Sequence, residues 1–432
     1  MAGRPPLRHS RPRAAIVVTG SELVRGERTD LNGPFLSRAL LALGLEPVRI
    51  HIVGDDPAEL ERTLSEAVAD ADLVAVSGGL GPTHDDRTVE LVAKVAGRPL
   101  ELRPELEREI ESFSRGVAER MKRPYADFEA GVRKQATLPA GAESLGLAGT
   151  APGLVVEVGA TPVVVLPGPP SELQRLWPNA LATAAVRRVL DRGQTPLRRT
   201  LRFFGAGEST VAQAFAEAGG DGDGVEVTIC ARDFEIVVEL LAEPEAGERA
   251  EALTEGLRAR LAKHLYSDDG RTVHEIVLGL CRKQSLTLVT AESCTGGLLA
   301  AGLTAVPGYS DVTLGGIVAY GNELKRSELG VSPELIERYG VVSAEVAEAM
   351  AKGARERLGA DVAISITGVA GPGGGTEEKP VGLVLYHAET PAGGRGASFS
   401  FPGNRDSIRR RSVIASLHLA RRLLTQNRHR DV

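Results

Sequence analysis

Apolar runs alternate with amphipathic stretches in the first part of the chain. Short runs rich in Val, Ile and Ala, such as AAIVVTG at 14–20, are typical of buried strands. Further strands are predicted at 46–54 and 72–81, and helices at 34–44 and 57–71. Strands that alternate with helices of this length indicate βαβ units and a parallel sheet.

The alternation returns near the end of the chain. Strands are expected at 285–293, 312–321, 360–368 and 380–390, and a long closing helix at 406–426. Between these two regions, from about 178 to 265, the pattern changes to short predicted strands with two helices. This pattern predicts a smaller module. The predicted fold class is α/β, with two three-layer α/β domains that have mainly parallel sheets, joined by a small α+β module. The predicted boundaries are 1–13 for a disordered basic tail, 14–177 and 270–426 for the α/β domains, and 178–265 for the module.

Composition narrows the function classes. The 51 Lys and Arg residues against 57 Asp and Glu give a net charge of −6, so no general nucleic-acid binding is expected. No apolar run approaches the roughly 20 residues of a membrane helix. The three cysteines are odd in number and widely spaced, which favours a reduced, cytoplasmic setting. The 50 glycines gather after the apolar runs, where nucleotide-binding loops form.

A first candidate site is SGGLGPTHDDRT at 77–88, between a strand and a helix. Ligands of open parallel sheets bind at such strand ends. Gly78, Gly79 and Gly81 let the backbone approach an anion such as phosphate.

Acidic residues follow these glycines. Asp85 and Asp86 would repel phosphate unless a divalent ion stood between, and hard carboxylate oxygens suit such an ion. Glu22, after the first strand, is expected to reach the same crevice. The alternative is that Asp85 and Asp86 only cap the helix that begins near Arg87.

A second candidate site is TAESCTGGLLAA at 290–301. Ser293 lies at a strand-to-helix turn, and Thr295, Gly296 and Gly297 open the helix. The helix end and small residues suggest an anion or oxyanion pocket. The neighbouring Cys294 is a rival nucleophile, because a thiolate at a helix start attacks amides readily.

A serine hydroxyl needs a base, and no Ser-His-Asp arrangement is evident. The segment AYGNELKR at 319–326 offers Tyr320 and Lys325 after another strand. A desolvated lysine has a lowered pKa and can act as base, with tyrosine orienting the proton. The alternative is a surface loop with a solvated lysine.

A third loop, SITGVAGPGGGTEEKP at 365–380, ends a further strand. Thr367, Gly368 and Gly371 are expected to form a second wall around a small ligand. Arg405, in FPGNRDSIRRR, is a candidate for a phosphate, or else a solvated helix start. Three such loops on one sheet make a pocket much more probable than one alone.

These motifs resemble a known family. AESCTGG, AYGNELK, SITGVAGPGGGTEEKPVG and FPGNRDSIRRR are similar to the C-terminal domain of the CinA family, the nicotinamide-nucleotide amidohydrolases. GSELVRGERTDLN, SGGLGPTHDDRT, GTAPGL and LPGPPSEL resemble its N-terminal domain, which has a molybdopterin-binding-like fold, and the middle segment resembles its KH-like module. The likeness covers nearly everything from about 14 to 425, with the motifs in the family's order.

The resemblance implies a function for the C-terminal domain. It implies hydrolysis of nicotinamide mononucleotide to nicotinic acid mononucleotide and ammonia, with no cofactor. Ser293 matches the family's nucleophile, Tyr320 and Lys325 its assisting pair, and Thr367 a residue that lines the site. Asn322, between Tyr320 and Lys325, is expected to bind substrate.

For the N-terminal domain the resemblance implies a metal-dependent ADP-ribose pyrophosphatase that uses Mg, Mn or Co. Asp85 and Asp86 would help to hold the ion, but Ser21 and Gly33 depart from the expected threonine and serine. The family also implies a homodimer. From a different class, the alternative is a competence-associated or nucleotide-sensing protein that binds without turnover.

Overall fold

The computed structural model describes residues 11–426, and this part of the chain divides into two compact units between Leu197 and Arg198. Residues 1–10 of the predicted tail lie outside the described residues. The tail prediction is wrong for 11–13, because Arg11 is buried and pairs with Glu46 at 3.1 Å, and Arg13 begins the first strand. Within 11–426, no helix is both long and apolar enough to cross a membrane.

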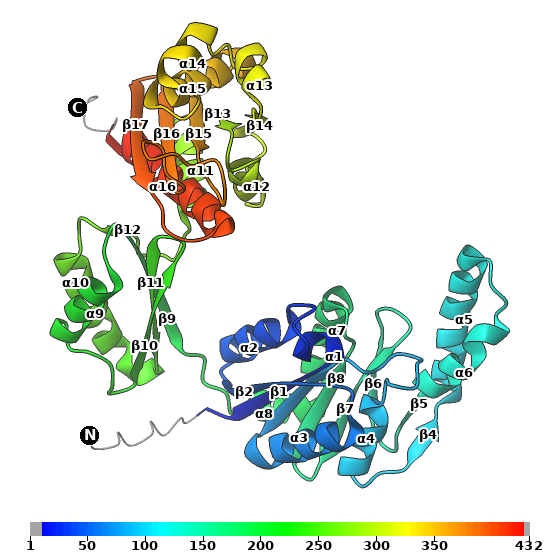
Figure 1. Ribbon diagram of the computed structural model, residues 1–432. Helices are drawn as coiled ribbons and strands as arrows, with labels where there is room; N and C mark the ends of the chain where they lie inside the picture. Colours follow the sequence, from blue (N-terminus) through cyan, green and yellow to red (C-terminus); the bar gives the residue numbers. More distant parts are fainter. Residues whose placement is uncertain (1–10, 427–432) are drawn as a thin grey trace. The chain divides into compact units, whose positions relative to one another are not determined.

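The first unit is built on a six-stranded sheet with the order β2-β1-β3-β8-β7-β6 (Figure 1). Its strands are β1 (Arg13–Thr19), β2 (Glu46–Val53), β3 (Leu73–Ser77), β6 (Glu143–Leu147), β7 (Pro152–Val158) and β8 (Thr161–Leu166). Strands β2, β1, β3 and β8 pair in parallel, whereas β7 pairs antiparallel with β8 and β6 antiparallel with β7. The predicted, mainly parallel sheet is confirmed.

Helices cover both faces of this sheet, because neighbouring strand residues point to opposite sides. The helices are α1 (Ser21–Val24), α2 (Asn32–Ala42), α3 (Pro57–Asp70), α4 (Thr88–Val95), α7 (Pro170–Ala182) and α8 (Ala184–Leu190). Val17 joins the apolar core beneath α3 and α4, whereas its neighbour Ile16 joins the core beneath α2, α7 and α8. The unit is therefore a three-layer α/β domain.

The first unit extends beyond the predicted boundary at 177. Helix α7 continues through Pro178 to Ala182, and Val186 and Val189 of α8 lie in the same core as Trp177. Because these apolar side chains cover the first sheet, residues 178–196 belong to this unit and not to the middle module.

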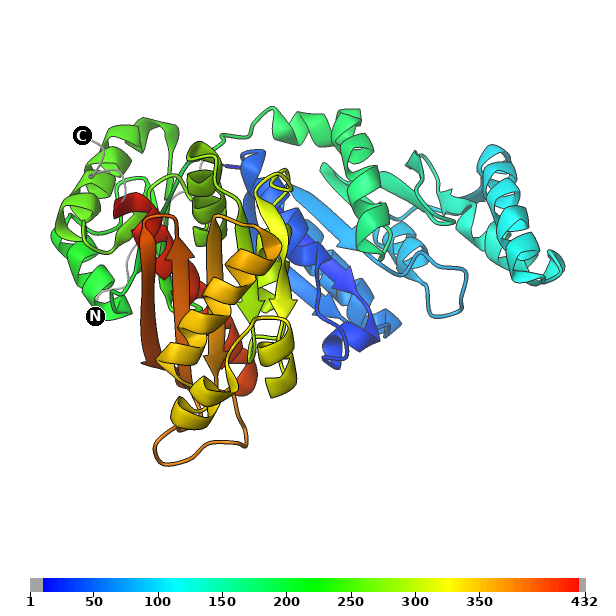
Figure 2. The same ribbon diagram turned by 90° about the horizontal axis from the view of Figure 1, so that it is seen from above.

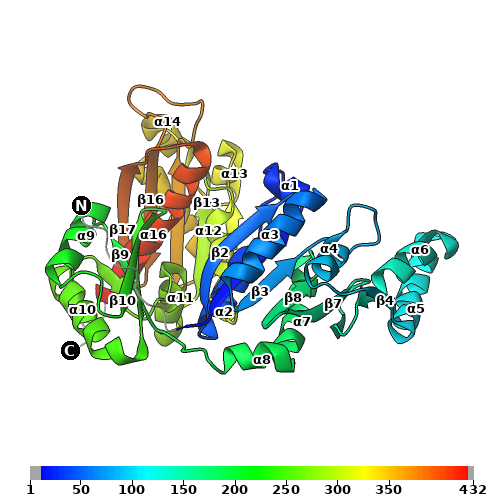
Figure 3. The ribbon, with the colours of Figure 1, turned by 90° about the horizontal axis from the view of Figure 1, so that it is seen from below.

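A helical pair projects from the first unit and was not predicted. Helices α5 (Pro104–Met121) and α6 (Ala126–Gln135) pack on each other beyond the small sheet of β4 (Leu100–Leu102) and β5 (Thr137–Pro139) (Figures 1 and 3). The end of α6 returns Lys134 and Gln135 toward the glycine loop that follows β3. The pair therefore contributes to the surroundings of the first candidate site.

The second unit begins with the middle module. Its elements are β9 (Leu197–Phe204), α9 (Glu208–Glu217), β10 (Val225–Arg232), β11 (Glu235–Ala242), the short 3-10 helix Pro244–Ala246, α10 (Gly247–Arg260) and β12 (Leu265–Ser267). The sheet has the order β10-β11-β9-β12, and Phe203, Val211 and Leu253 join it to α9 and α10 in one core. The predicted α+β character is confirmed, with a start near 197.

The C-terminal domain has a five-stranded sheet with the order β14-β13-β15-β16-β17. Its elements are α11 (Val273–Lys283), β13 (Leu288–Glu292), α12 (Leu298–Thr304), β14 (Thr313–Val318), α13 (Asn322–Ser327), α14 (Pro333–Tyr339), α15 (Ala344–Leu358), β15 (Val362–Gly368), β16 (Leu383–Thr390), β17 (Gly393–Ser400) and α16 (Arg405–Gln426). Strands β13, β14 and β15 pair in parallel, and β16 and β17 extend the sheet antiparallel.

Helices again cover both faces of this sheet. Helix α15 packs on one face, while α11 and α16 pack on the other (Figure 2). The carboxyl ends of the parallel strands β14, β13 and β15 lie at one edge. The segments that follow Glu292, Val318 and Gly368 therefore emerge side by side, as the sequence predicts.

Candidate active site

Ser293 occupies a tight turn between β13 and α12. Its backbone N–H donates to the carbonyl of Ile366 on β15 at 2.9 Å, and its own carbonyl accepts from Gly296 N–H at 3.0 Å. Gly296 and Gly297 have φ values of 61° and 90°, a left-handed conformation that glycine adopts without strain. The side chain of Ser293 is only 8% exposed, so the turn presents a largely desolvated hydroxyl.

Glu292 connects this turn to the start of α12 by hydrogen bonds. Its fully buried carboxylate accepts backbone N–H groups of Leu299 at 3.0 Å and Ala300 at 2.8 Å, in the first turn of α12. The expectation that this helix end binds a substrate anion is wrong, because the protein's own carboxylate already occupies those donors. Sequence reasoning missed Glu292, although it stands directly before Ser293.

The Cys294 thiol is packed into the protein and lies near the amine of Lys325. The residue is 6% exposed and belongs to the apolar core beneath α11 and α16. Burial raises the pKa of the Cys294 thiol to about 12, so the thiolate is disfavoured near neutral pH. These properties favour Ser293 over Cys294 as nucleophile.

Lys325 on α13 is buried, in contrast to the alternative of a solvated surface lysine. It is 2% exposed, and its amino group donates a long hydrogen bond of 3.4 Å to the carbonyl of Tyr320. It pairs with no carboxylate among the described residues. Burial lowers the pKa of Lys325, while its interaction with the Cys294 thiol acts in the opposite direction. The amine therefore lies near the Ser293 turn with a pKa shifted toward that of a base.

Arg405 joins two of the three predicted loops. Its guanidinium donates to the carbonyl of Gly371 at 2.7 Å and to the hydroxyl of Tyr320 at 2.9 Å. Tyr320 is 60% exposed, so its ring stands at the surface of the site. Since Arg405 has further N–H groups, it remains able to contact a substrate anion.

The other predicted residues lie around this centre. The hydroxyl of Thr367 donates to the carbonyl of Val341 at 2.9 Å, which leaves its lone pairs as acceptors. Gly368 lies so close to β16 that a Cβ would be 2.7 Å from the carbonyl of Leu383. Asn322 is exposed at the start of α13.

Sequence reasoning also missed Arg409. Its Nε and Nη2 atoms donate to the carbonyl of Thr295 at 3.2 Å and 2.6 Å. Helix α16 thereby holds the Ser293 turn with Arg409, one helical turn after Arg405. The hydroxyl of Thr295 is fully buried and finds no hydrogen-bond partner within residues 11–426.

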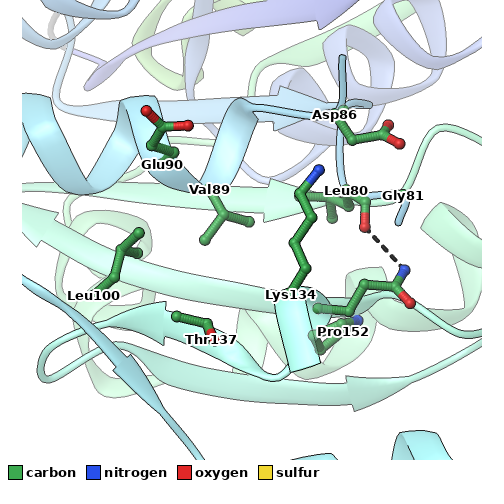
Figure 4. Close-up of a pocket in the computed structure, with 11 residues that line it drawn as sticks. Leu80, Gly81, Asp86, Val89, Glu90, Leu100, Lys134, Thr137 and Pro152 are labelled. Atoms are coloured by element: carbon green, nitrogen blue, oxygen red, sulfur yellow. Dashed lines mark hydrogen bonds between the residues drawn. The ribbon is translucent and has the colours of Figure 1, made fainter. Parts of the chain in front are cut away.

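In the first unit, the glycine loop after β3 borders a cavity of about 230 Å³ (Figure 4). Gly78 and Gly79 have φ values of 103° and 66°, and a Cβ at Gly79 would lie 2.1 Å from the Thr88 hydroxyl. Apolar and polar side chains share the walls. The cavity is lined by Gly79, Leu80, Gly81, Asp86, Val89, Glu90, Leu100, Lys134, Gln135, Thr137 and Pro152.

Asp85 and Asp86 do not cap α4, which begins after Arg87 without a side-chain cap. Both carboxylates instead accept from the hydroxyl of Thr83, and Asp86 also accepts from Thr83 N–H at 3.0 Å. The Thr83 hydroxyl holds the pKa of Asp85 below its usual range. The pair therefore closes a tight turn beside the cavity.

The structure does not bring all three residues of the predicted metal-ligand set, Glu22, Asp85 and Asp86, to one cavity. Glu22 lines a different cavity, beside Asp30 and Asn32, whereas Asp86 lines the cavity with Lys134. No cluster of three or more His, Cys, Asp or Glu side chains suited to a metal ion occurs in the part of the chain that the structure describes. Of the predicted set, Asp85 and Asp86 lie together, on the hydroxyl of Thr83.

Fold and site together define a multidomain α/β protein with a buried lysine beside a serine turn. Family models match in the same order: a probable molybdopterin binding domain at 15–186, the KH domain of damage-inducible protein CinA at 198–267, and the CinA C-terminal domain at 270–424.

Relatives match along nearly the whole chain. A CinA-like protein of Mycolicibacterium paratuberculosis is 46% identical over 96% of this chain and 98% of its own length. A CinA-like protein of Mycobacterium leprae is also 46% identical, over 96% of this chain and 97% of its own length. The solved competence/damage inducible protein of Agrobacterium tumefaciens is 38% identical, covers 36% of this chain and 95% of its own, and has a TM-score of 0.34. The chain belongs to the CinA family.

Proposed function

We propose that the C-terminal domain hydrolyses the carboxamide of nicotinamide mononucleotide, releasing nicotinic acid mononucleotide and ammonia. The observation that carries this proposal is Lys325, which is 2% exposed, has a lowered pKa and interacts with the residue after Ser293. A lysine is rarely buried without a carboxylate partner unless its uncharged amine is used. In this proposal the amine that lies near Cys294 also serves the hydroxyl of the preceding residue, Ser293, and so activates it as a nucleophile for acyl transfer.

The chemistry follows from these two groups. The Ser293 hydroxyl attacks the carboxamide carbon while its proton passes to the neutral amine of Lys325. The tetrahedral intermediate collapses, the C–N bond breaks, and the proton held by Lys325 leaves with ammonia. Water then attacks the acyl-Ser293 ester and gives a proton to Lys325; the ester C–O bond breaks, Lys325 returns the proton to the Ser293 oxygen, and nicotinic acid mononucleotide is released.

Neighbouring groups orient the substrate in this proposal. The Tyr320 hydroxyl accepts a hydrogen bond from Arg405, which leaves its own O–H free to donate a hydrogen bond to the leaving nitrogen and to orient it toward Lys325. Arg405 also contacts Gly371, so it is suited to hold the nucleotide phosphate between two loops. Backbone N–H groups of the Ser293 turn are the candidates for the oxyanion, in place of the helix end that Glu292 occupies.

The test is to incubate the full chain with nicotinamide mononucleotide and to measure ammonia and nicotinic acid mononucleotide. We expect equal amounts of both products from the wild type and none above background from Ser293→Ala. An active Ser293→Ala variant together with an inactive Cys294→Ala variant would contradict the assignment. Tight nucleotide binding without ammonia would favour the alternative, a nucleotide-sensing protein.

A second activity is proposed for the first unit, because its cavity of about 230 Å³ combines apolar walls with Lys134. In Figure 4 the Lys134 side chain extends across the cavity toward the loop that carries Asp86. The lining also carries Asp86 and Glu90, so Lys134 is the group in it that attracts an anion, and an ammonium group beside apolar walls suits a phosphorylated ligand with a flat ring, such as ADP-ribose.

Pyrophosphatase activity of this unit is tested by AMP release from ADP-ribose, with and without Mg, Mn or Co. Lys134→Gln is expected to raise KM, because it removes the positive charge from the cavity. Arg120→Gln, a charge removal near the far end of α5, is the matched control. Release that Lys134→Gln leaves unchanged would remove this cavity from the proposal. Light scattering of the full chain tests the predicted homodimer.

A further inference from the structure

Helix α16 contacts two different parts of the second unit within one helical turn. On one side, Arg409 donates to the carbonyl of Thr295 at 2.6 Å and so holds the Ser293 turn. The next residue, Arg410, donates to the carboxylate of Asp233 at 3.0 Å. Asp233 lies at the tip of the β10–β11 hairpin in the middle module. Adjacent residues of one helix thus connect the module with the turn that carries the proposed nucleophile.

The hairpin tip has an unusual backbone. Asp233 and Phe234 have φ values of 48° and 79°, which suit the two-residue turn of a β-hairpin, but a bulky residue such as Phe234 rarely adopts this left-handed conformation. Such strain persists only where the surroundings compensate for it. Here the Phe234 ring packs against Phe399 and Phe401 of the C-terminal domain, with centroids 4.9 Å and 5.4 Å apart. The strained turn directs an aromatic side chain into that domain.

Glu235, the third residue of the tip, also contacts the C-terminal domain. The buried carboxylate of Glu235 accepts from Nε2 of His418 on α16 at 2.7 Å. Phe204 of the module stacks on the His418 ring with centroids 3.8 Å apart. Beside these contacts a hollow of about 520 Å³ remains, lined in part by Phe234 and Arg411. The module is therefore held to α16 by the contacts of 233–235 together with the aromatic packing of Phe204 and Tyr266 around His418.

We propose that the hairpin tip 233–235 is a positioning element for the deamidase site. It holds the first turns of α16 in register, and Arg409 on those turns keeps the Ser293 turn in its reactive geometry. Asp233 and Phe234 are then positioning residues, which act on the reaction without touching the substrate. The activity part of this inference rests on the proposed function of Ser293.

The activity test uses the full chain and three substitutions. Asp233→Asn and Phe234→Asn keep a residue type that tolerates positive φ, and Arg410→Gln removes the partner charge. Each is expected to lower kcat about threefold to tenfold and to leave KM unchanged. Asp233→Asn and Arg410→Gln combined are expected to lower kcat no further than the stronger single change. Arg198→Gln, which breaks the Arg198–Glu239 pair in the same module, is the matched control with wild-type kcat.

A second measurement does not depend on turnover. Hydrogen exchange of the amides in 293–298 is expected to accelerate in Asp233→Asn and Phe234→Asn, while exchange in β15 stays at the wild-type rate. If the wild type releases no ammonia, the proposed function fails, and exchange alone decides this inference. Exchange rates in 293–298 equal to those of Arg198→Gln would overturn it. Equal acceleration in 293–298 and β15 would also overturn it, since that result indicates general loosening.

Discussion

The guanidinium of Arg405 donates a 2.9 Å hydrogen bond to the hydroxyl of Tyr320, 85 residues earlier in the chain. The same guanidinium binds the carbonyl of Gly371, so one side chain fastens the tyrosine loop and the glycine-rich loop to the start of α16. The bond also fixes the direction of the tyrosine hydroxyl, because an oxygen that accepts from Arg405 must direct its own proton elsewhere. Arg405 therefore has a structural role in the site besides any contact with phosphate.

Replacement of Arg405 is expected to affect both binding and turnover. Arg405→Ala removes two charge-assisted hydrogen bonds and is predicted to lower kcat/KM about 10- to 100-fold. In a Tyr320→Phe background the same change is expected to have a smaller effect, because the hydroxyl partner is already absent. Steady-state kinetics of the four proteins checks this. Strictly additive effects would show that the Arg405–Tyr320 bond does not contribute to the reaction.

Lys325→Met tests the proposed base. The variant is expected to lower kcat about 10²- to 10⁴-fold, the usual contribution of a positioned acid–base group. Its melting temperature is expected to equal or exceed that of the wild type, because a buried amine is replaced by an apolar chain of similar size. Thermal unfolding therefore separates loss of the base from loss of the fold. A variant with wild-type kcat would exclude Lys325 from the chemistry.

The pH dependence of the wild type follows from the same residue. Burial lowers the pKa of Lys325, and only the deprotonated amine accepts a proton. We expect kcat/KM to rise with pH and to level off above an apparent pKa lower than the ordinary lysine value of about 10.4. Activity is lost as the pH falls through that value. A profile of kcat/KM from pH 6 to 10 measures it, and the rising limb should be absent from the residual activity of Lys325→Met.

Much of this arrangement was predictable because it depends on local patterns. Alternating apolar runs fixed the strands, and glycine-rich segments after Glu292 and Thr367 marked where strands end. Parallel pairing of β14, β13 and β15 then brings those ends together without further information. The proximity of the Ser293 turn to Lys325 is a consequence of sheet order.

Other features depend on contacts that no local pattern contains. Arg409 and Thr295 are separated by 114 positions, and nothing in the helical pattern of α16 distinguishes Arg409 from Arg410. In the sequence, Glu292 is an ordinary polar residue at a strand end. Only the structure shows that its carboxylate accepts hydrogen bonds from the first turn of α12. Glu22, in α1 after β1, and Asp86, in the loop after β3, follow adjacent strands, yet they line different cavities. Side-chain direction in loops is set by tertiary packing and not by spacing.

Glu292→Gln tests the carboxylate behind the nucleophile turn. The carboxylate of Glu292 accepts one backbone N–H on each oxygen, from Leu299 and from Ala300. The glutamine side chain has only one oxygen, so its NH₂ group would face one of these N–H donors. We expect a loss of about 1 to 3 kcal/mol in the free energy of unfolding, together with reduced kcat. Urea denaturation and ammonia release measure the two effects. Glu337→Gln, at an exposed position of α14, is the control and should change neither.

The environment of His418 leads us to expect that the free energy of unfolding of the second unit depends on pH. Its Nε2–H donates to Glu235, and its Nδ1 accepts from Arg421 at 3.3 Å, so the ring is held in its neutral form. Burial lowers the pKa of His418 to about 4, whereas an unfolded histidine titrates near 6.5. Between these values the unfolded chain binds the additional proton, and stability therefore falls as the pH is lowered.

The expected slope from this group is about 1.4 kcal/mol per pH unit between roughly pH 6 and pH 4. Carboxylates also titrate in this range, so the contribution of His418 is isolated by comparison with His418→Gln. The variant keeps a donor for Glu235 and cannot be protonated. Urea denaturation at half-unit steps of pH is expected to show the wild type losing stability relative to the variant as the pH falls. Parallel curves would show that His418 is protonated in the folded protein and that Glu235 stabilises its charge.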